Sequence, residues 1–145
     1  MRCSLRTFPK TVLVAEDDPN DVHLFELAAQ HLPPGELRFE VVRDGEEAIA
    51  YLEGSGKFAD REQHPFPDLV LLDVRMPKLS GFQVLDWIRN ESARKDLKVF
   101  VWADSQFESD VNRARQGGAD RVIPKPNQLA ALREILRQIR DSLLS

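Results

Sequence analysis

Three short apolar runs, each ending directly before an acidic residue, constrain the fold of this chain more than any other feature. Continuous apolar runs of this length, without polar alternation, are typical of central strands in a sheet that is covered on both faces. The runs and the acids that follow them are residues 11–15 with Glu16, residues 68–72 with Asp73, and residues 99–103 with Asp104. The sequence therefore predicts a buried sheet with carboxylates at the ends of its central strands.

Helical periodicity fills the stretches between these runs and two weaker strand candidates, residues 37–43 and 121–123. Asp18 is a good N-cap and Pro19 suits the first helical position. Strands that alternate with helices must run parallel, and right-handed crossovers place the helices on both faces of the sheet. The predicted helices are residues 19–32, 44–52, 82–90, 107–116 and 127–144.

Length and composition limit the class of protein. A chain of 145 residues is expected to form one domain over residues 1–145, with a core of about 10–143. The net charge of −4 argues against a nucleic-acid surface, and the single Cys3 excludes an internal disulfide. No apolar stretch approaches a membrane span, and residues 1–10 lack the apolar run of a signal peptide. We expect a soluble, cytoplasmic protein.

Four acidic residues follow two of the predicted central strands: Glu16, Asp17 and Asp18 after one, and Asp73 after another. In an open parallel sheet the ligand crevice lies beyond the carboxyl ends of the strands. Two carboxylates 4 Å apart repel by about 4 kcal/mol at an effective dielectric constant near 20. Such clusters are tolerated where they hold a hard divalent cation such as Mg²⁺. The alternative is that Asp18 only caps a helix and the other acids are solvated.

Lys125 follows the last short strand and is expected to reach the same crevice. A lysine opposite an acid cluster can form ion pairs at rest and meet a phosphoryl oxygen afterwards. Acids and a lysine at three strand ends are together more specific than any one of them.

These residues resemble the receiver domains of two-component response regulators, from about Lys10 to Leu143. The motifs that carry the resemblance are Glu16-Asp17-Asp18, Leu71 through Pro77 with Gly81 beyond it, Gly118-Ala119-Asp120, and Lys125-Pro126. The resemblance implies an α/β, CheY-like fold: a flavodoxin-like (βα)5 three-layer sandwich with parallel strand order 2-1-3-4-5. Residues 67–85 are most similar to the stand-alone regulators that accompany bacterial phytochromes.

The resemblance also implies roles for the acidic cluster. Asp73 is expected to accept a phosphoryl group from a histidine kinase, and Lys125 to neutralise a phosphoryl oxygen. The bond between Lys125 and Pro126 is expected to be cis. The implied Mg²⁺ ligands are Glu16 through water, Asp17, Asp73 and the backbone carbonyl of Arg75. The chain would not be an enzyme beyond self-catalysed phosphoryl transfer and hydrolysis.

Two positions depart from the family. Ala103 stands where receivers carry Thr or Ser, and Val122 stands where they carry Tyr or Phe. The lost hydroxyl would donate a hydrogen bond to the phosphoryl group, and valine is too stiff to swing as an aromatic ring does. Asp104 adds a negative charge nearby, and Ser105 lies one pleat too far to replace the hydroxyl. We predict phosphorylation on Asp73 with weakened coupling; the alternative is a pseudo-receiver that is read without phosphorylation.

The expected partners are proteins. A sensor histidine kinase or a phosphotransfer protein would supply the phosphoryl group, and no DNA-binding segment follows the last predicted helix. The basic stripe of that helix, Arg133, Arg137 and Arg140, is either a solvated face or a docking surface. A homodimer could form through the face made by the fourth helix, fifth strand and fifth helix. The long loop of residues 53–67 is either a surface excursion or a partner-binding loop.

A phosphatase of the haloacid-dehalogenase type is disfavoured. Those enzymes also use an Asp nucleophile at a strand end, but they need a second Asp two positions on, where this chain has Arg75.

Overall fold

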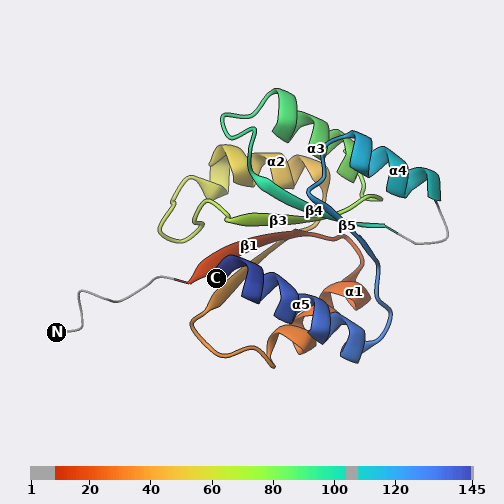
Figure 1. Cartoon of the computed structure of the whole chain (residues 1–145). Helices are drawn as coiled ribbons and strands as arrows, with labels where there is room; N and C mark the ends of the chain where they lie inside the picture. Colours follow the sequence, from red (N-terminus) through yellow and green to blue (C-terminus); the bar gives the residue numbers. More distant parts are fainter. Residues whose placement is uncertain (1–8, 104–107, 145) are drawn as a thin grey trace.

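A five-stranded parallel sheet forms the middle layer of the computed structural model, which describes residues 9–103 and 108–144 (Figure 1). The strand order is β2-β1-β3-β4-β5, and all pairs are parallel. The strands are β1 (Lys10–Ala15), β2 (Leu37–Val42), β3 (Leu69–Asp73), β4 (Lys98–Ala103) and β5 (Arg121–Pro124). The predicted three-layer, flavodoxin-like fold with order 2-1-3-4-5 is confirmed.

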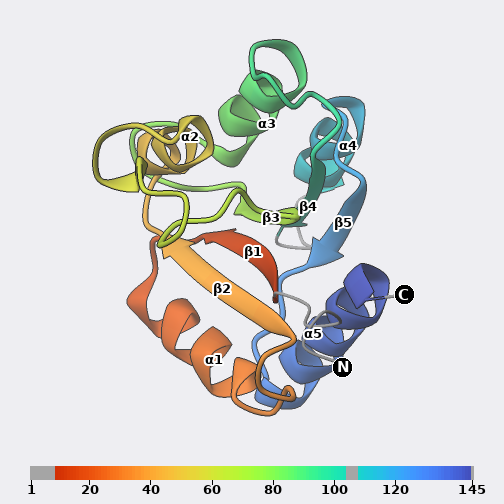
Figure 2. The same ribbon diagram turned by 90° about the vertical axis from the view of Figure 1, so that its left-hand side faces the viewer.

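Helices cover both faces of this sheet. Helices α1 and α5 lie on one face, and α2, α3 and α4 lie on the other, as Figures 1 and 2 show from two directions. The helices are α1 (Pro19–Ala29), α2 (Gly45–Glu53), α3 (Gly81–Asn90), α4 (Glu108–Gln116) and α5 (Leu129–Leu144), with a short 3-10 turn, η2, at Gly56–Phe58. Within the described part of the chain, no helix is long and apolar enough to cross a bilayer.

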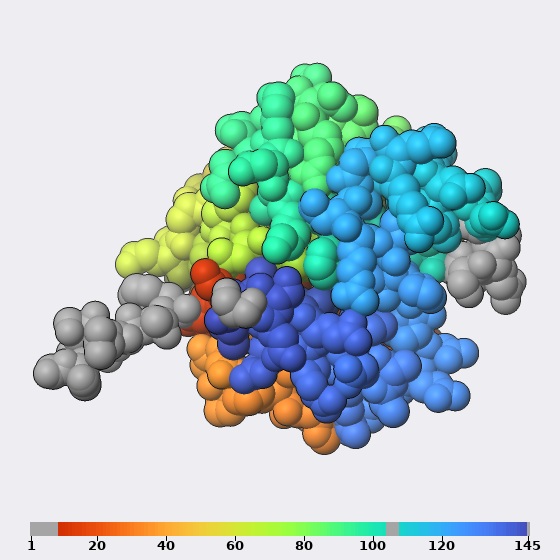
Figure 3. Space-filling model, in the orientation of Figure 1, coloured from red at the N-terminus to blue at the C-terminus, as the bar shows by residue number. Residues whose placement is uncertain are grey.

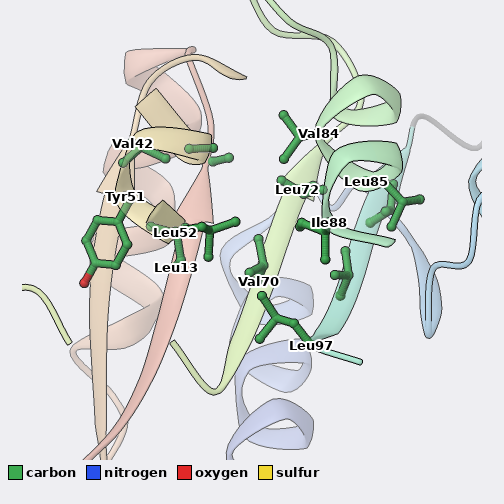
Figure 4. Packing of buried hydrophobic residues seen from close by; sticks show 14 of the residues in the cluster. Leu13, Val42, Tyr51, Leu52, Val70, Leu72, Val84, Leu85, Ile88 and Leu97 are labelled. Carbon is green, nitrogen blue, oxygen red and sulfur yellow. The ribbon is translucent and has the colours of Figure 1, made fainter. Parts of the chain in front are cut away.

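Successive residues of the central strands pack into different cores. Leu13, Val70 and Leu72 face α2 and α3 in the close-up of Figure 4. Their neighbours Val12 and Leu71 join the core under α1 and α5. All five side chains are fully buried, as expected for strands with a helical layer on each face.

The helix starts follow from side-chain caps. Asp18 Oδ1 accepts a hydrogen bond from the backbone of Asn20 at 2.8 Å, which begins α1 as predicted. The end of α1 differs: the helix stops at Ala29, whereas the pattern predicted residue 32. His31 and Leu32 donate backbone hydrogen bonds three residues back rather than four, so the chain tightens before it leaves the helix.

The loop between α2 and β3 is tied to the core. The Arg61 guanidinium donates hydrogen bonds to the carbonyls of Tyr51 and Leu52 at 2.8 and 2.9 Å, which satisfies two end carbonyls of α2. The buried Tyr51 hydroxyl donates to Pro65 O at 2.9 Å, and burial raises the pKa of Tyr51 to about 12. Binding of a partner by this loop stays a prediction.

Gly81 begins α3 at a point where a side chain has no room. An added Cβ would lie 2.3 Å from Asp73 O and 2.8 Å from Val74 Cα, both of them backbone atoms. We therefore expect Gly81→Ala to lower the free energy of unfolding by about 1–3 kcal/mol, measured by urea denaturation. The matched control is Gly117→Ala, whose Cβ first meets a side-chain methyl of Leu85 at 3.1 Å. Equal urea midpoints for the two variants would contradict this account.

Candidate functional site

Lys125 stands at the centre of the site, directly after β5. Its Nζ lies 2.8 Å from Asp73 Oδ2, 2.9 Å from Glu16 Oε1 and 3.0 Å from Asp21 Oδ2. The backbone N–H of Lys125 donates to Ala103 O at 3.0 Å, which extends the β4–β5 pairing by one residue and aims the side chain across the sheet end. One ammonium thus faces three carboxylates, so the cluster keeps a surplus of negative charge.

Glu16 is the most buried member of this cluster, with 2% of its surface exposed. Its Oε2 accepts a hydrogen bond from the backbone of Asp18 at 3.1 Å. Its Oε1 forms the ion pair with Lys125 but has no aligned hydrogen bond, although it is buried. Burial raises the pKa of Glu16 to about 7; Lys125 opposes that rise and the negative charge of Asp73 adds to it.

The pKa of Lys125 moves the other way. Burial alone would lower the pKa of its ammonium, but contacts with Asp73, Glu16 and Asp21 together outweigh burial and raise it above the usual value for lysine. Lys125 is therefore charged at neutral pH.

The acids meet the requirements of a hard cation. Glu16, Asp17 and Asp73 each offer one carboxylate oxygen, and these oxygens lie within 4.8 Å of one another. They line a hollow of about 300 Å³ together with Asp21, Arg75 and Lys125, and Asp17 lies toward solvent. Glu16 Oε1 has no hydrogen-bond donor aligned on it, so beside its ion pair with Lys125 it could also coordinate a cation. This all-oxygen set, open on one side to water, fits Mg²⁺.

The loop after β3 brings Arg75 to the same place. Its backbone N–H donates to Asp73 Oδ1 at 3.3 Å, so both oxygens of Asp73 have a partner. Metal ligation by the Arg75 carbonyl stays a prediction.

Asp18 is exposed, serves as the cap of α1 as predicted, and borders the same hollow. One expectation needs correction. The bond between Lys125 and Pro126 is trans, since the described residues contain no cis peptide bond. Lys125 reaches all three carboxylates from this trans backbone.

Asp21 was missed as a member of the site. The structure shows that the Asp21 carboxylate contacts Lys125. The available signal was its position three residues after the N-cap Asp18, within the first helical turn at the carboxyl edge of the sheet.

The structure also places the two departures from the family pattern. Ala103 ends β4 and is 1% exposed, and its carbonyl accepts a hydrogen bond from the backbone N–H of Lys125. Val122 is half-buried and packs against the core under α2, α3 and α4. Asp104 and Ser105 lie outside the described residues.

A second charged contact was not foreseen. Arg75 Nη2 donates to Asp110 Oδ2 at 2.5 Å and so joins the loop after β3 to the first turn of α4.

Comparison with known proteins now identifies the family. Residues 12–137 match the response regulator receiver domain, so the chain belongs to this family of signalling modules of two-component systems. The polar-differentiation response regulator DivK of Brucella anthropi is 28% identical over 118 residues, which are 81% of this chain and 85% of DivK. The response regulator GtcR of Aneurinibacillus migulanus is 34% identical over 132 residues, 90% of this chain; the chain spans about half of GtcR, 48%.

Similar solved structures include regulators associated with phytochromes. The phosphorylated cyanobacterial phytochrome response regulator RcpA has a TM-score of 0.82 and 31% identity, covering 94% of this chain and 95% of RcpA. The Mn²⁺-bound form of response regulator Rcp1 has a TM-score of 0.79 and 28% identity, covering 94% and 96%. The expected similarity to phytochrome-associated regulators is confirmed.

The raised pKa of Glu16 predicts proton release on metal binding. Near pH 7 about half of the Glu16 carboxyls carry a proton, and a cation binds only the carboxylate. Mg²⁺ should therefore displace about half a proton at pH 7 and almost none at pH 8.5. Isothermal titration calorimetry in buffers of different ionisation enthalpy measures this number. Glu16→Gln should abolish the release at pH 7, and a release that persists in this variant would assign it to another group.

The central position of Lys125 predicts a specific stability defect. Lys125→Met leaves three carboxylates without their cation, which should cost about 1–3 kcal/mol of unfolding free energy at pH 8 without divalent ions. Mg²⁺ should then raise the melting temperature of the variant more than that of the unaltered protein. The control is Lys57→Met, which removes an exposed ion pair with Glu47. Equal losses in the two variants would contradict a central role for Lys125.

Proposed function

We propose that this protein accepts a phosphoryl group on Asp73 from the phosphohistidine of a histidine kinase or a phosphotransfer protein. The observation that carries the proposal is the position of the Asp73 carboxylate. It ends β3, is 5% exposed, and is held by Lys125 at 2.8 Å within reach of two further carboxylates. A carboxylate fixed at the mouth of a charged hollow can act as a nucleophile.

The transfer needs no side chain beyond those in the cluster. An oxygen of Asp73 attacks phosphorus, the P–N bond of the phosphohistidine breaks, and the imidazole nitrogen keeps the electron pair and takes a proton from water. The product is an acyl phosphate. Lys125, already beside Asp73, neutralises a phosphoryl oxygen, and the Arg75 N–H orients the carboxylate. Mg²⁺ held by Glu16, Asp17 and Asp73 would neutralise further charge on the phosphoryl oxygens.

The pseudo-receiver alternative is not favoured. Its basis is the pair of substitutions at Ala103 and Val122, which concern the response to phosphorylation. Glu16, Asp17, Asp73 and Lys125, which concern phosphorylation itself, come together in one hollow.

The signal is proposed to pass on by protein contact in the cytoplasm, with a homodimer through the α4–β5–α5 face as one route. In the space-filling view of Figure 3, the cyan surface of α4 and the blue surface of α5 lie on the side turned to the viewer. The basic residues of α5 are engaged within the chain: Arg137 pairs with Glu134, and Arg140 pairs with Glu36. These pairs favour the solvated-face interpretation of the basic stripe.

Incubation with acetyl phosphate and Mg²⁺ tests the proposal. Mass spectrometry should show the addition of one phosphoryl group, lost on treatment with hydroxylamine as expected for an acyl phosphate. Asp73→Asn should remain unmodified, and Asp86→Asn, which alters an exposed acid of α3 that accepts a hydrogen bond from Asn90 and does not line the hollow, should be phosphorylated normally. Absence of the added mass, or its presence in Asp73→Asn, would overturn the proposed function.

A further inference from the structure

Arg75 and Asp110 form an unequal ion pair beside the proposed phosphorylation site. The Asp110 side chain is 13% exposed, whereas the Arg75 side chain is 65% exposed. Asp110 belongs to the first turn of α4, and Arg75 belongs to the loop that follows Asp73. A surface guanidinium thus neutralises a carboxylate that is largely out of water.

The same arginine borders the hollow that would receive the phosphoryl group. Arg75 lines this hollow together with Asp73 and Lys125, and its backbone N–H binds Asp73 Oδ1. Its three-carbon stem lets the guanidinium turn toward either Asp110 or the hollow without backbone movement.

A phosphoryl group on Asp73 would lack one hydrogen-bond donor, because the side chain at position 103 cannot supply it. Ala103 has no hydroxyl, and Val122 has no ring that could report a movement. A phosphoryl group carries a charge of about −1.5 to −2 near pH 7, against −1 for Asp110, and guanidinium binds such oxygens with two parallel hydrogen bonds.

We infer that Arg75 changes partner on phosphorylation, from Asp110 to the phosphoryl group on Asp73, and thereby releases α4. The inference rests on the proposed function. Once Arg75 leaves, the largely buried Asp110 carboxylate has lost its cation, and the first turn of α4 opens to hydrate it. Arg75 thus supplies both the missing phosphoryl donor and the missing link to α4.

Competition for one guanidinium predicts the direction in which each variant changes the affinity for a phosphoryl group. Because binding free energies are reciprocally linked, removal of the competitor Asp110 strengthens phosphoryl binding, and removal of Arg75 weakens it. An ion pair that only stabilised the fold would make both variants change in the same direction.

The equilibrium experiment uses beryllofluoride with Mg²⁺ as the probe, since it occupies the place of a phosphoryl group on a carboxylate. We expect Asp110→Asn to lower the dissociation constant about fivefold and Arg75→Ala to raise it about fivefold, with Arg75→Lys between the latter and the unaltered protein. The matched control is Arg113→Ala, which alters an α4 arginine that stacks on Phe82. The dissociation constant of beryllofluoride from this variant should equal that of the unaltered protein. Shifts of the same sign in Arg75→Ala and Asp110→Asn, or no shift in either, would overturn the inference.

Hydrogen exchange at residues 112–115, whose backbone N–H groups donate to the carbonyls of the first turn of α4, gives an independent readout of that turn. In the unaltered protein beryllofluoride should speed exchange at these residues about tenfold or more, and in Arg75→Ala they should exchange fast with or without the probe. Unchanged exchange in the unaltered protein with the probe bound would contradict release of α4. Failure of beryllofluoride to bind the unaltered protein at all would instead count against the proposed function, so the two failures are distinguishable.

Discussion

One ammonium group organises the carboxyl edge of this sheet. Lys125 Nζ lies within 3.0 Å of carboxylates from three separate segments, and without it those charges would repel across a partly buried space. Helix α1, strand β3 and the segment after β5 are held in mutual position by this contact. The proposed nucleophile, the proposed metal ligands and the cation that would meet a phosphoryl group are therefore held in position within the protein itself.

The same arrangement explains why the site sits where it does. Strands buried on both faces have no room for charge along their length, so the charged residues gather where the strands end. Glu16 and Asp73 are each the first polar residue after a buried run, and both remain nearly inaccessible to water. Their partial desolvation accounts for the raised pKa of Glu16 and for the strength of the contacts that Lys125 makes.

The structure also separates the parts of the site by their roles. The residues proposed for phosphorylation line one hollow, whereas Ala103 and Val122, at the two positions that depart from the family pattern, concern the proposed response to it. The ion pair between Arg75 and Asp110 connects the loop beside the site to α4. A receiver of this kind can keep its chemistry and move its output to other side chains, since the two depend on different residues.

The sequence by itself determined the order of strands and helices along the chain, the parallel sheet, and the presence of Glu16, Asp17, Asp73 and Lys125 at the carboxyl edge of that sheet. These followed from local patterns, because buried runs, caps and alternating elements leave few topologies. Only the tertiary structure decided that Asp21 joins Lys125, that Arg75 binds Asp110 and that the bond before Pro126 is trans. The two side-chain contacts join residues that lie 104 and 35 positions apart in the sequence. They depend on side-chain directions, which no local pattern encodes.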